Sequence, residues 1–123
     1  MLIEMVRSKI HRAKVTDANL NYEGSISIDE KLLLASGIRN HQKVMVVNIN
    51  NGNRFETYAI SSKKPNEICL NGAAARLVCV GNIVIVMAFC LIDSNDSDQF
   101  ESIFVNVDEN NNIMKIENIK NCE

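Results

Sequence analysis

The sequence lacks the long apolar run that would mark a membrane-spanning protein. Its longest uninterrupted apolar stretch, Ile83–Ile92, has ten residues, about half of the ~20 that a transmembrane helix needs. As a strand, a run this apolar predicts burial on both faces. Charged residues appear as early as Glu4 and Arg7, which argues against a secretory signal. We therefore expect a cytoplasmic protein with no membrane partner.

Metal-binding patterns are also missing. The four cysteines, Cys69, Cys79, Cys90 and Cys122, include no C-x-x-C pair, and the two histidines lack the spacing of metal ligands. The first three cysteines stand in apolar, strand-like segments, where buried and reduced thiols are the common state. The sequence therefore predicts no metal site.

Basic charge is sparse as well. Residues 1–92 carry 11 Lys and Arg against 7 Asp and Glu, and residues 93–123 carry 2 against 8. These balances of +4 and −6 add to the net charge of −2. A mildly basic body suits a small anionic ligand, whereas nucleic acid usually needs a dense basic stripe. We expect no nucleic-acid partner, and we interpret 93–123 as a polar, acidic, solvated C-terminal extension with a last strand near 113–116.

What the sequence does contain is a series of short β-rich segments separated by turn signals, typical of a small closed barrel. With 123 residues, of which 46% are hydrophobic, the chain suits one domain or one subunit of an assembly. A helix is expected over about 28–36, because Ser27 and Glu30 have capping-box spacing and Gly37 stands at the C-terminal cap position. Asn51-Gly52 predicts a type I′ hairpin turn.

Four segments carry the chemistry. In order and spacing, Lys9–Thr16 (KIHRAKVT), Tyr22–Asp29 (YEGSISID), Asn50–Tyr58 (NNGNRFETY) and Asn71–Arg76 (NGAAAR) resemble signature segments of bacterial aspartate 1-decarboxylases. The resemblance implies a mainly β fold, a small six-stranded double-psi β-barrel with short helices, as the catalytic domain over 1–92. It also implies a homotetramer whose active sites lie between neighbouring subunits.

The Gly24-Ser25 dipeptide matches the position at which these enzymes cut their own chain. A serine hydroxyl can attack the preceding carbonyl carbon, and glycine there removes the Cβ that would block an unusual backbone turn. β-Elimination and loss of ammonia then leave a covalently bound pyruvoyl group derived from Ser25. Gly-Ser alone is a commonplace loop dipeptide, so the surrounding segments carry this prediction.

The function implied by the resemblance is pyruvoyl-dependent decarboxylation of L-aspartate to β-alanine and CO2, which feeds pantothenate and coenzyme A synthesis in the family. The pyruvoyl carbonyl forms a Schiff base with the substrate amine and acts as an electron sink. The protein would thus be a lyase that matures from a zymogen by autocatalytic cleavage. Whether this cleavage is spontaneous or needs a maturation factor stays open.

The resemblance also gives roles to single residues. Tyr58 is the expected proton donor, and Thr57 is expected to assist self-cleavage and to contact the substrate. Arg54 and Lys9 would supply cations for the aspartate carboxylates, because arginine can clamp a carboxylate with two hydrogen bonds. His11 fits a substrate-lining role and a structural strand histidine equally well. The other expected substrate-binding residues are Asn71, Gly72, Ala73 and Ala74.

Other functions remain as alternatives. Ser25–Ile38 followed by Lys43–Val46 is similar to DNA-binding regulators of the swapped-hairpin type. Residues 24–50 hold only three cations of Lys and Arg against two acidic residues, which is too few for strong phosphate binding. A catalytically silent barrel would keep an intact chain with no amine-reactive carbonyl. A pyruvoyl enzyme for a different amino acid is the nearest variant, although Lys9 and Arg54 favour an acidic substrate.

Overall fold

The computed structural model describes residues 1–120, which contain nine β-strands and three short helices. The strands are β1 (Leu2–Lys14), β2 (Asp17–Asn19), β3 (Ser25–Asp29), β4 (Lys43–Asn48), β5 (Arg54–Ser62), β6 (Ile68–Asn71), β7 (Ile83–Asp93), β8 (Glu101–Val107) and β9 (Ile113–Lys120). The helices are α1 (Glu30–Ser36) and the 3₁₀ helices η1 (Gly72–Leu77) and η2 (Ser94–Gln99). The predicted mainly β fold with short helices is confirmed.

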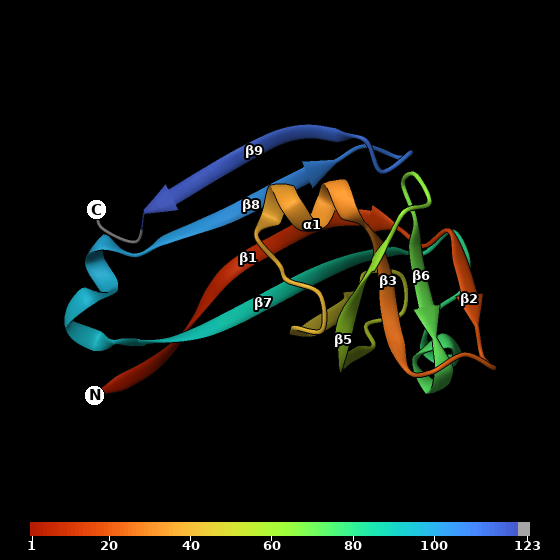
Figure 1. The fold of residues 1–123 in the computed structure, drawn as a ribbon, viewed down its shortest axis with the longest axis horizontal. Coiled ribbons are helices and arrows are strands. Elements are labelled where there is room, and N and C mark those ends of the chain that lie inside the picture. The colour runs from red at the N-terminus through yellow and green to blue at the C-terminus, as the bar shows by residue number, and fades with distance from the viewer. Residues whose placement is uncertain (121–123) are drawn as a thin grey trace.

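All nine strands belong to one sheet, in the order β2-β6-β3-β5-β4-β7-β1-β8-β9. The pairs β2/β6, β3/β5 and β1/β8 are parallel and the others are antiparallel. The long strands β1, β7, β8 and β9 form an extended arm, and the shorter strands gather at its other end (Figure 1). Within the described residues the sheet does not close into a barrel, since β2 and β9 are its two edges.

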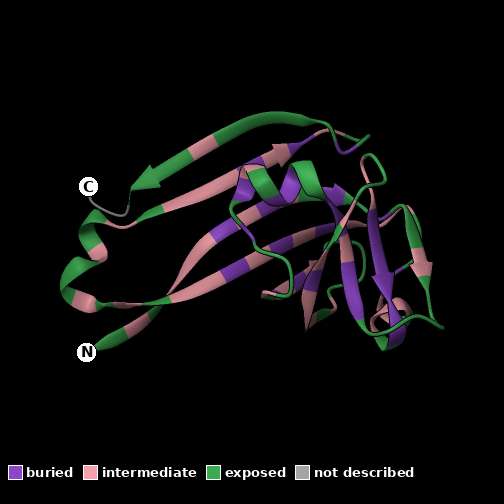
Figure 2. Ribbon diagram, in the orientation of Figure 1, coloured by how far each residue is buried: buried purple, intermediate pink, exposed green. Residues whose placement is uncertain are grey.

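The core follows the alternation of side chains along each strand. On β7, Val84, Val86 and Ala88 are fully buried, whereas the residues between them are only half-buried. Helix α1 packs across the inner face of the sheet against β1, β3, β5 and β8, and buries Leu32 and Leu33 there. Figure 2 shows the buried positions concentrated in β3, β6 and the middle of β1 and β7. Burial of β7 on both faces, expected from its composition, is therefore not found in the single chain.

Helix α1 begins later than its sequence pattern indicates. The side chain of Asp29, rather than that of Ser27, caps it by accepting a hydrogen bond from the Lys31 amide at 2.8 Å. Ser27 cannot cap the helix because it lies within β3. The C-terminal prediction is confirmed: Gly37 adopts φ +78° and its amide bonds to the Leu33 carbonyl.

The hairpin predicted at Asn51-Gly52 joins β4 to β5, but its turn is longer than a two-residue type I′ turn. The last bond of the ladder runs from the Asn48 amide to the Asn53 carbonyl, and the Gly52 amide bonds back to the Asn48 carbonyl. Asn48 is fully buried, and its side chain accepts the Asn50 amide and donates to the Leu77 carbonyl. This anchoring by a buried side chain selects the longer loop.

The acidic C-terminal segment contributes to the sheet and to the core. β8 lies beside β1 in parallel register, with Ser8 opposite Ile103, and Val105 is fully buried. β9 pairs with β8 and is exposed along nearly its whole length (Figure 2). A strand was expected only near 113–116, so β8 was missed.

The cysteines differ in their surroundings. Cys69 is buried, Cys90 is half-buried and Cys79 is exposed, so the expectation of three buried thiols is wrong for Cys79, which lies in the turn after η1. Cys122 lies outside the described residues. No helix in the described part of the chain is long and apolar enough to cross a lipid bilayer.

Candidate functional site

The Gly24-Ser25 bond lies at the start of β3, where this strand pairs with β6. In the antiparallel register Ser25 stands opposite Asn71, and Ser27 stands opposite Cys69. Directly opposed residues of a β-pair point to the same face, so these four side chains form one group, here called the Ser25 cluster. Isoleucines and leucines of the same two strands point the other way, into the core.

Hydrogen bonds fix the Ser25 hydroxyl. Its Oγ donates to the Glu23 carbonyl oxygen at 3.0 Å and accepts from Asn71 Nδ2 at 2.9 Å. Ser25 is fully buried and Asn71 is 2% exposed. The nucleophile predicted from the sequence is thus fixed by two hydrogen bonds and buried, whereas Glu23 and Gly24 before it are exposed.

Gly72 brings the backbone of η1 against the predicted cleavage site. A Cβ at position 72 would lie 2.7 Å from Gly24 Cα and 2.8 Å from Gly24 N, closer than real Cβ contacts come. Gly72 also adopts φ +69°, a region that glycine enters without strain. At Gly24, by contrast, a Cβ would meet nothing within 4 Å and φ is not in the left-handed region. The conformational need for glycine therefore falls on Gly72, and the expectation that placed it on Gly24 is wrong.

Thr57 and Tyr58 lie on β5, which pairs in parallel with β3. The parallel ladder between β3 and β5 begins at Ile26 opposite Ala59. Extended by two residues, this register sets Tyr58 level with Ser25 and Thr57 level with Gly24. Tyr58 is half-buried and packs edge-to-face on His41, with ring centroids 5.9 Å apart. Of the other predicted residues, Ala73 is exposed on η1, and Ala74 is half-buried and packs against the core.

Lys9 and His11 lie together on the outer face of the sheet, which is the face opposite helix α1. Lys9 Nζ sits 4.6 Å from the centroid of the Phe104 ring, and His11 stands opposite Asn106 of β8. His11 Nδ1 is buried without a hydrogen-bond partner among the described residues. Burial, followed by the positive charges of Lys9 and Arg12, lowers the pKa of His11. His11 is therefore held in its neutral form by its surroundings.

Arg54 lies on the same outer face of the sheet as Lys9, but among different neighbours. It stands opposite Val47, which in turn stands opposite Ile85. Within the described residues neither Arg54 nor Lys9 forms an ion pair, so both cations are free to meet an anionic ligand. Strands β5, β4 and β7 lie between β3 and β1. In the order of the sheet, three strands therefore separate Lys9 and His11 on β1 from Ser25 on β3.

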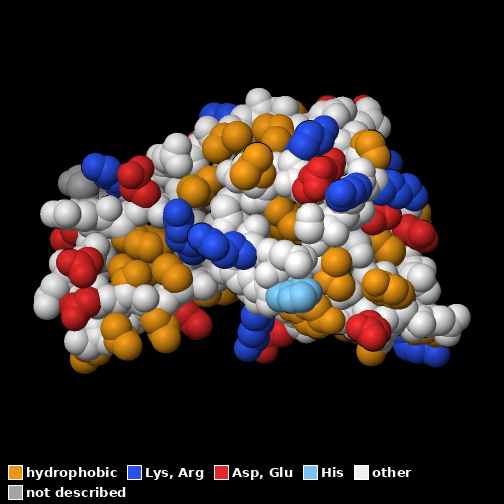
Figure 3. Space-filling model, in the orientation of Figure 1, with side chains coloured by type: hydrophobic (Ala, Val, Ile, Leu, Met, Phe, Trp, Pro, Cys, Tyr) orange, Lys and Arg blue, Asp and Glu red, His pale blue; other side chains and the backbone are white. Residues whose placement is uncertain are grey.

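The outer face that carries these cations is largely apolar. Its half-buried positions are Met45, Val47, Ile85, Met87, Phe89 and Phe104. Hydrophobic side chains also gather over the outer part of the arm (Figure 3), where Leu2 and Leu91 are exposed. An apolar surface of this extent is typical of a face that another chain covers.

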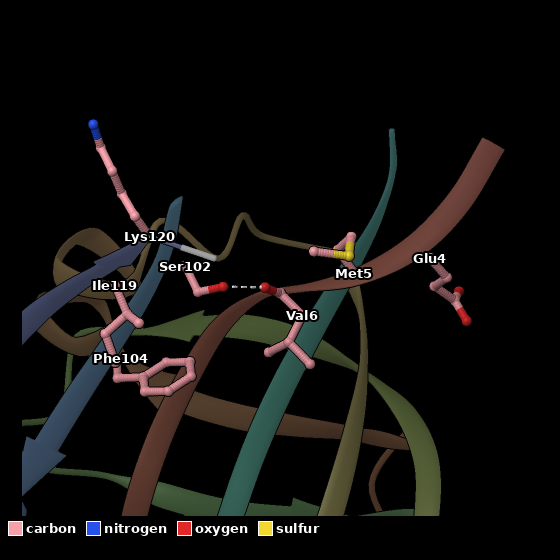
Figure 4. A pocket seen from close by; sticks show the side chains of 7 residues that line it. All are labelled: Glu4, Met5, Val6, Ser102, Phe104, Ile119 and Lys120. Atoms are coloured by element: carbon pink, nitrogen blue, oxygen red, sulfur yellow. Dashed lines mark hydrogen bonds between the residues drawn. The ribbon is translucent and has the colours of Figure 1, made fainter. Parts of the chain in front are cut away.

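A cavity of about 470 Å³ lies on the arm, away from the Ser25 cluster. Figure 4 shows Met5, Val6 and Phe104 around it, with Ser102 Oγ donating to the Val6 carbonyl oxygen at 2.6 Å. None of its seven lining residues was predicted as a site residue from the sequence. Phe104 links this cavity to Lys9 through the ring contact described above.

Two residues near the predicted site were missed by the sequence patterns. Cys69 touches Asn71, and its position two residues before Asn71 on one strand face was the available signal. Phe104 contacts Lys9, but no local pattern indicates a pairing between residues so far apart in the sequence.

Comparisons with known proteins show what the sequence is similar to. A family model described as aspartate decarboxylase matches residues 1–114. A protein named aspartate 1-decarboxylase from Caldicellulosiruptor saccharolyticus is 58% identical over 119 residues, covering 96% of this chain and 93% of that protein. Proteins of the same name from Campylobacter jejuni and Campylobacter fetus are 55% and 53% identical, over 96% and 92% of this chain and 94% and 98% of theirs.

Proposed function

The chain belongs to the aspartate decarboxylase family, and we propose that it cuts itself between Gly24 and Ser25 and then converts L-aspartate to β-alanine and CO2. The observation that carries this is the Ser25 cluster. It contains a fully buried serine hydroxyl, next in the chain to the bond to be cut, that is fixed by one hydrogen bond to the Glu23 carbonyl oxygen and one from Asn71 Nδ2. The pathway role in pantothenate and coenzyme A synthesis and a cytoplasmic location stay predictions.

Self-cleavage uses groups of a single chain. Ser25 Oγ bonds to the Gly24 carbonyl carbon, the bond from that carbon to the Ser25 nitrogen breaks, and the hydroxyl proton ends on this nitrogen. Elimination then releases Gly24 as a carboxylate, and addition of one water with loss of one ammonia leaves a pyruvoyl group at position 25. The register of β5 supports a role for Thr57 beside Gly24. Cleavage that is aided by a maturation factor would use the same groups.

The cluster fits a pyruvoyl group at position 25. Asn71 Nδ2 donates to Ser25 Oγ, and because that oxygen leaves with Gly24 in the elimination, the amide would be free to donate to the new carbonyl oxygen at position 25. When present, the group supplies an electron-withdrawing carbonyl that favours loss of a carboxylate from a bound amino acid. We assign the proton donation to the Tyr58 hydroxyl, and the pairing of β5 with β3 supports this role.

Substrate binding needs cations, because aspartate carries two carboxylates. Arg54 and Lys9 are unpaired cations on the outer sheet face, and His11 beside Lys9 adds a polar but neutral ring. Since three strands separate Lys9 from Ser25 in the order of the sheet, we place the complete substrate site between two copies of the chain. The apolar outer face supports such an assembly, and we propose the homotetramer as its form.

The test is the intact mass of the purified protein under denaturing conditions, compared with the variant Ser25→Ala. The parent should give chains 1–24 and 25–123, with the larger lighter by one ammonia than simple hydrolysis would make it. Ser25→Ala should stay folded, uncleaved and inactive towards aspartate, because the attacking hydroxyl is gone. A parent chain that keeps its full-length mass after warm incubation, or a Ser25→Ala variant that cleaves, would contradict the proposal.

A further inference from the structure

We propose that Cys69 is a positioning residue for self-cleavage: its thiol orients the Asn71 amide, which in turn holds the Ser25 hydroxyl. This role rests on the proposed self-cleavage at Gly24-Ser25. Among the described residues, Cys69 forms no hydrogen bond with Gly24 or Ser25. It acts through Asn71.

The contacts form a continuous chain. Cys69 Sγ donates to Asn71 Oδ1 at 3.2 Å. Asn71 Nδ2 donates to Ser25 Oγ at 2.9 Å and to Ser27 Oγ at 3.0 Å. The β3/β6 register makes this geometry obligatory, because it sets Cys69 opposite Ser27 and Asn71 opposite Ser25 on the same face. Cys69 is 6% exposed, so water does not compete for the Asn71 oxygen.

The thiol matters because an asparagine amide has two ends of similar shape. Its oxygen accepts and its nitrogen donates, and either end could face the two serine hydroxyls. A serine hydroxyl can donate or accept, so Ser25 and Ser27 alone do not select one orientation. A protonated thiol is a donor, and it therefore holds the Asn71 oxygen on its own side. The Asn71 nitrogen is then left to face Ser25.

The protonated state of the thiol is secured by its surroundings. Burial, followed by the negative charges of Asp17 and Glu67, raises the pKa of Cys69 to about 11. At neutral pH the sulfur therefore keeps its proton. The neighbouring strand β2 supports this arrangement, since Asp17 stands opposite Cys69 in the parallel β2/β6 ladder.

The orientation of Asn71 determines where the Ser25 proton points. With the Asn71 nitrogen facing it, Ser25 Oγ accepts that bond and donates its own proton to the Glu23 carbonyl. If the amide were reversed, its oxygen would accept the hydroxyl proton, and Ser25 would lose its bond to the Glu23 carbonyl. The oxygen that must bond to the Gly24 carbonyl carbon would then lose one of the two contacts that fix it.

The experiment follows the rate of Gly24-Ser25 cleavage by intact mass in full-length Cys69→Val, Cys69→Ala and Cys69→Ser. Valine and alanine remove the donor, and alanine serves if valine fails to fold. Serine keeps a donor of similar length. We expect cleavage about tenfold slower in the valine and alanine variants, the effect of losing one buried hydrogen bond. In the serine variant we expect cleavage restored to within about threefold of the parent. Cys90→Ala, outside the Ser25 cluster, is the matched control.

Each outcome of this experiment either supports or overturns the positioning role of Cys69. Slow cleavage with valine or alanine, recovery with serine and an unchanged control would support the positioning role. A parent rate in the alanine variant, or equal slowing in alanine and serine, would overturn it, because the donor would then be irrelevant. A parent chain that never cleaves would instead remove the proposed function itself, and the role of Cys69 with it.

Discussion

Two glycines of this chain have nearly the same backbone conformation but different surroundings. Gly52 has φ +78° with open space where a Cβ would stand, whereas Gly72 has φ +69° with the backbone of Gly24 in that place. We expect Gly52→Ala to lower the free energy of unfolding by about 1 kcal/mol, the cost of a left-handed conformation. Gly72→Ala should lower it by about 3 kcal/mol or more, since backbone must also move.

The comparison is best made by denaturant unfolding in the uncleaved Ser25→Ala background at one protein concentration. In the parent background, Gly72→Ala should also abolish cleavage, while Gly52→Ala should cleave normally. Equal losses of stability in the two variants would mean that the Gly24 backbone yields easily, and the close approach would lose its significance.

At the scale of single residues, the sequence predicted which residues lie near Gly24-Ser25 better than it predicted why each of them is needed. Gly24, Ser25, Asn71 and Gly72 were expected together, and the structure brings them together. The reason for glycine was assigned to the wrong position, because the close contact joins residues 48 apart and no local pattern reveals it. Cys69 was interpreted as a core thiol, since a cysteine between isoleucine and leucine usually is one.

Among the elements, the turn between β8 and β9 is attached to the rest of the sheet mainly by the side chain of Asn111, with one further bond from Asn66 Nδ2 to Asn112 Oδ1. Asn111 Oδ1 accepts the Lys14 amide, and its Nδ2 donates to the carbonyls of Lys14 and Asn66. Asn111 is 2% exposed and has φ +62°. Asn111→Gly keeps the conformation but removes the three bonds, and we expect it to lower the free energy of unfolding by about 2–4 kcal/mol.

Asn110→Gly, in the same turn but exposed, is the matched control for chemical denaturation and should cost less than about 1 kcal/mol. Hydrogen exchange would localise the effect, since the amides of β8 and β9 should lose protection before those of β3 and β6. Similar losses in the two variants would contradict an anchoring role for Asn111.

The elements that the sequence predicted are those whose signals are local. The end of α1 at Gly37 and the hairpin near Gly52 depend on residues within a few positions, and both are confirmed. The start of α1 was misplaced because Ser27 is engaged by Asn71, which is 44 residues away. β8 was missed because its partner β1 lies at the opposite end of the chain.

For the molecule as a whole, the division of the proposed substrate site between two copies of the chain predicts that a variant can keep self-cleavage and lose decarboxylation. The groups around Gly24-Ser25 come from one chain, whereas Lys9 is proposed to act on a neighbouring copy. Met45→Lys places a charge on the apolar outer face, opposite Glu56, where it is tolerated in a single chain but costly in an interface. We expect this variant to cleave normally, to run as a smaller species, and to lose at least about tenfold in kcat/KM.

Met114→Lys is the matched control, because Met114 is 68% exposed on the edge strand β9. Size-exclusion chromatography with light scattering gives the assembly state, intact mass gives cleavage, and β-alanine formation gives activity. Full activity from a dissociated Met45→Lys chain would show that one copy holds a complete site, contrary to the shared arrangement.

The position of β1 in the sheet has a consequence for the growing chain on the ribosome. Strands β2 to β6, which surround Gly24-Ser25, pair only among themselves apart from the contact of β4 with β7, and are complete by residue 71. β1 emerges first but must wait for β7 and β8, which end at residues 93 and 107. Because local contacts form before distant ones, the scissile bond acquires its neighbours while the earliest strand is still without a partner. Self-cleavage before β1 has joined the sheet would leave chain 1–24, with β1 inside it, attached only through the short pairing of β2 with β6, so the order of synthesis favours a cleavage that is slower than folding.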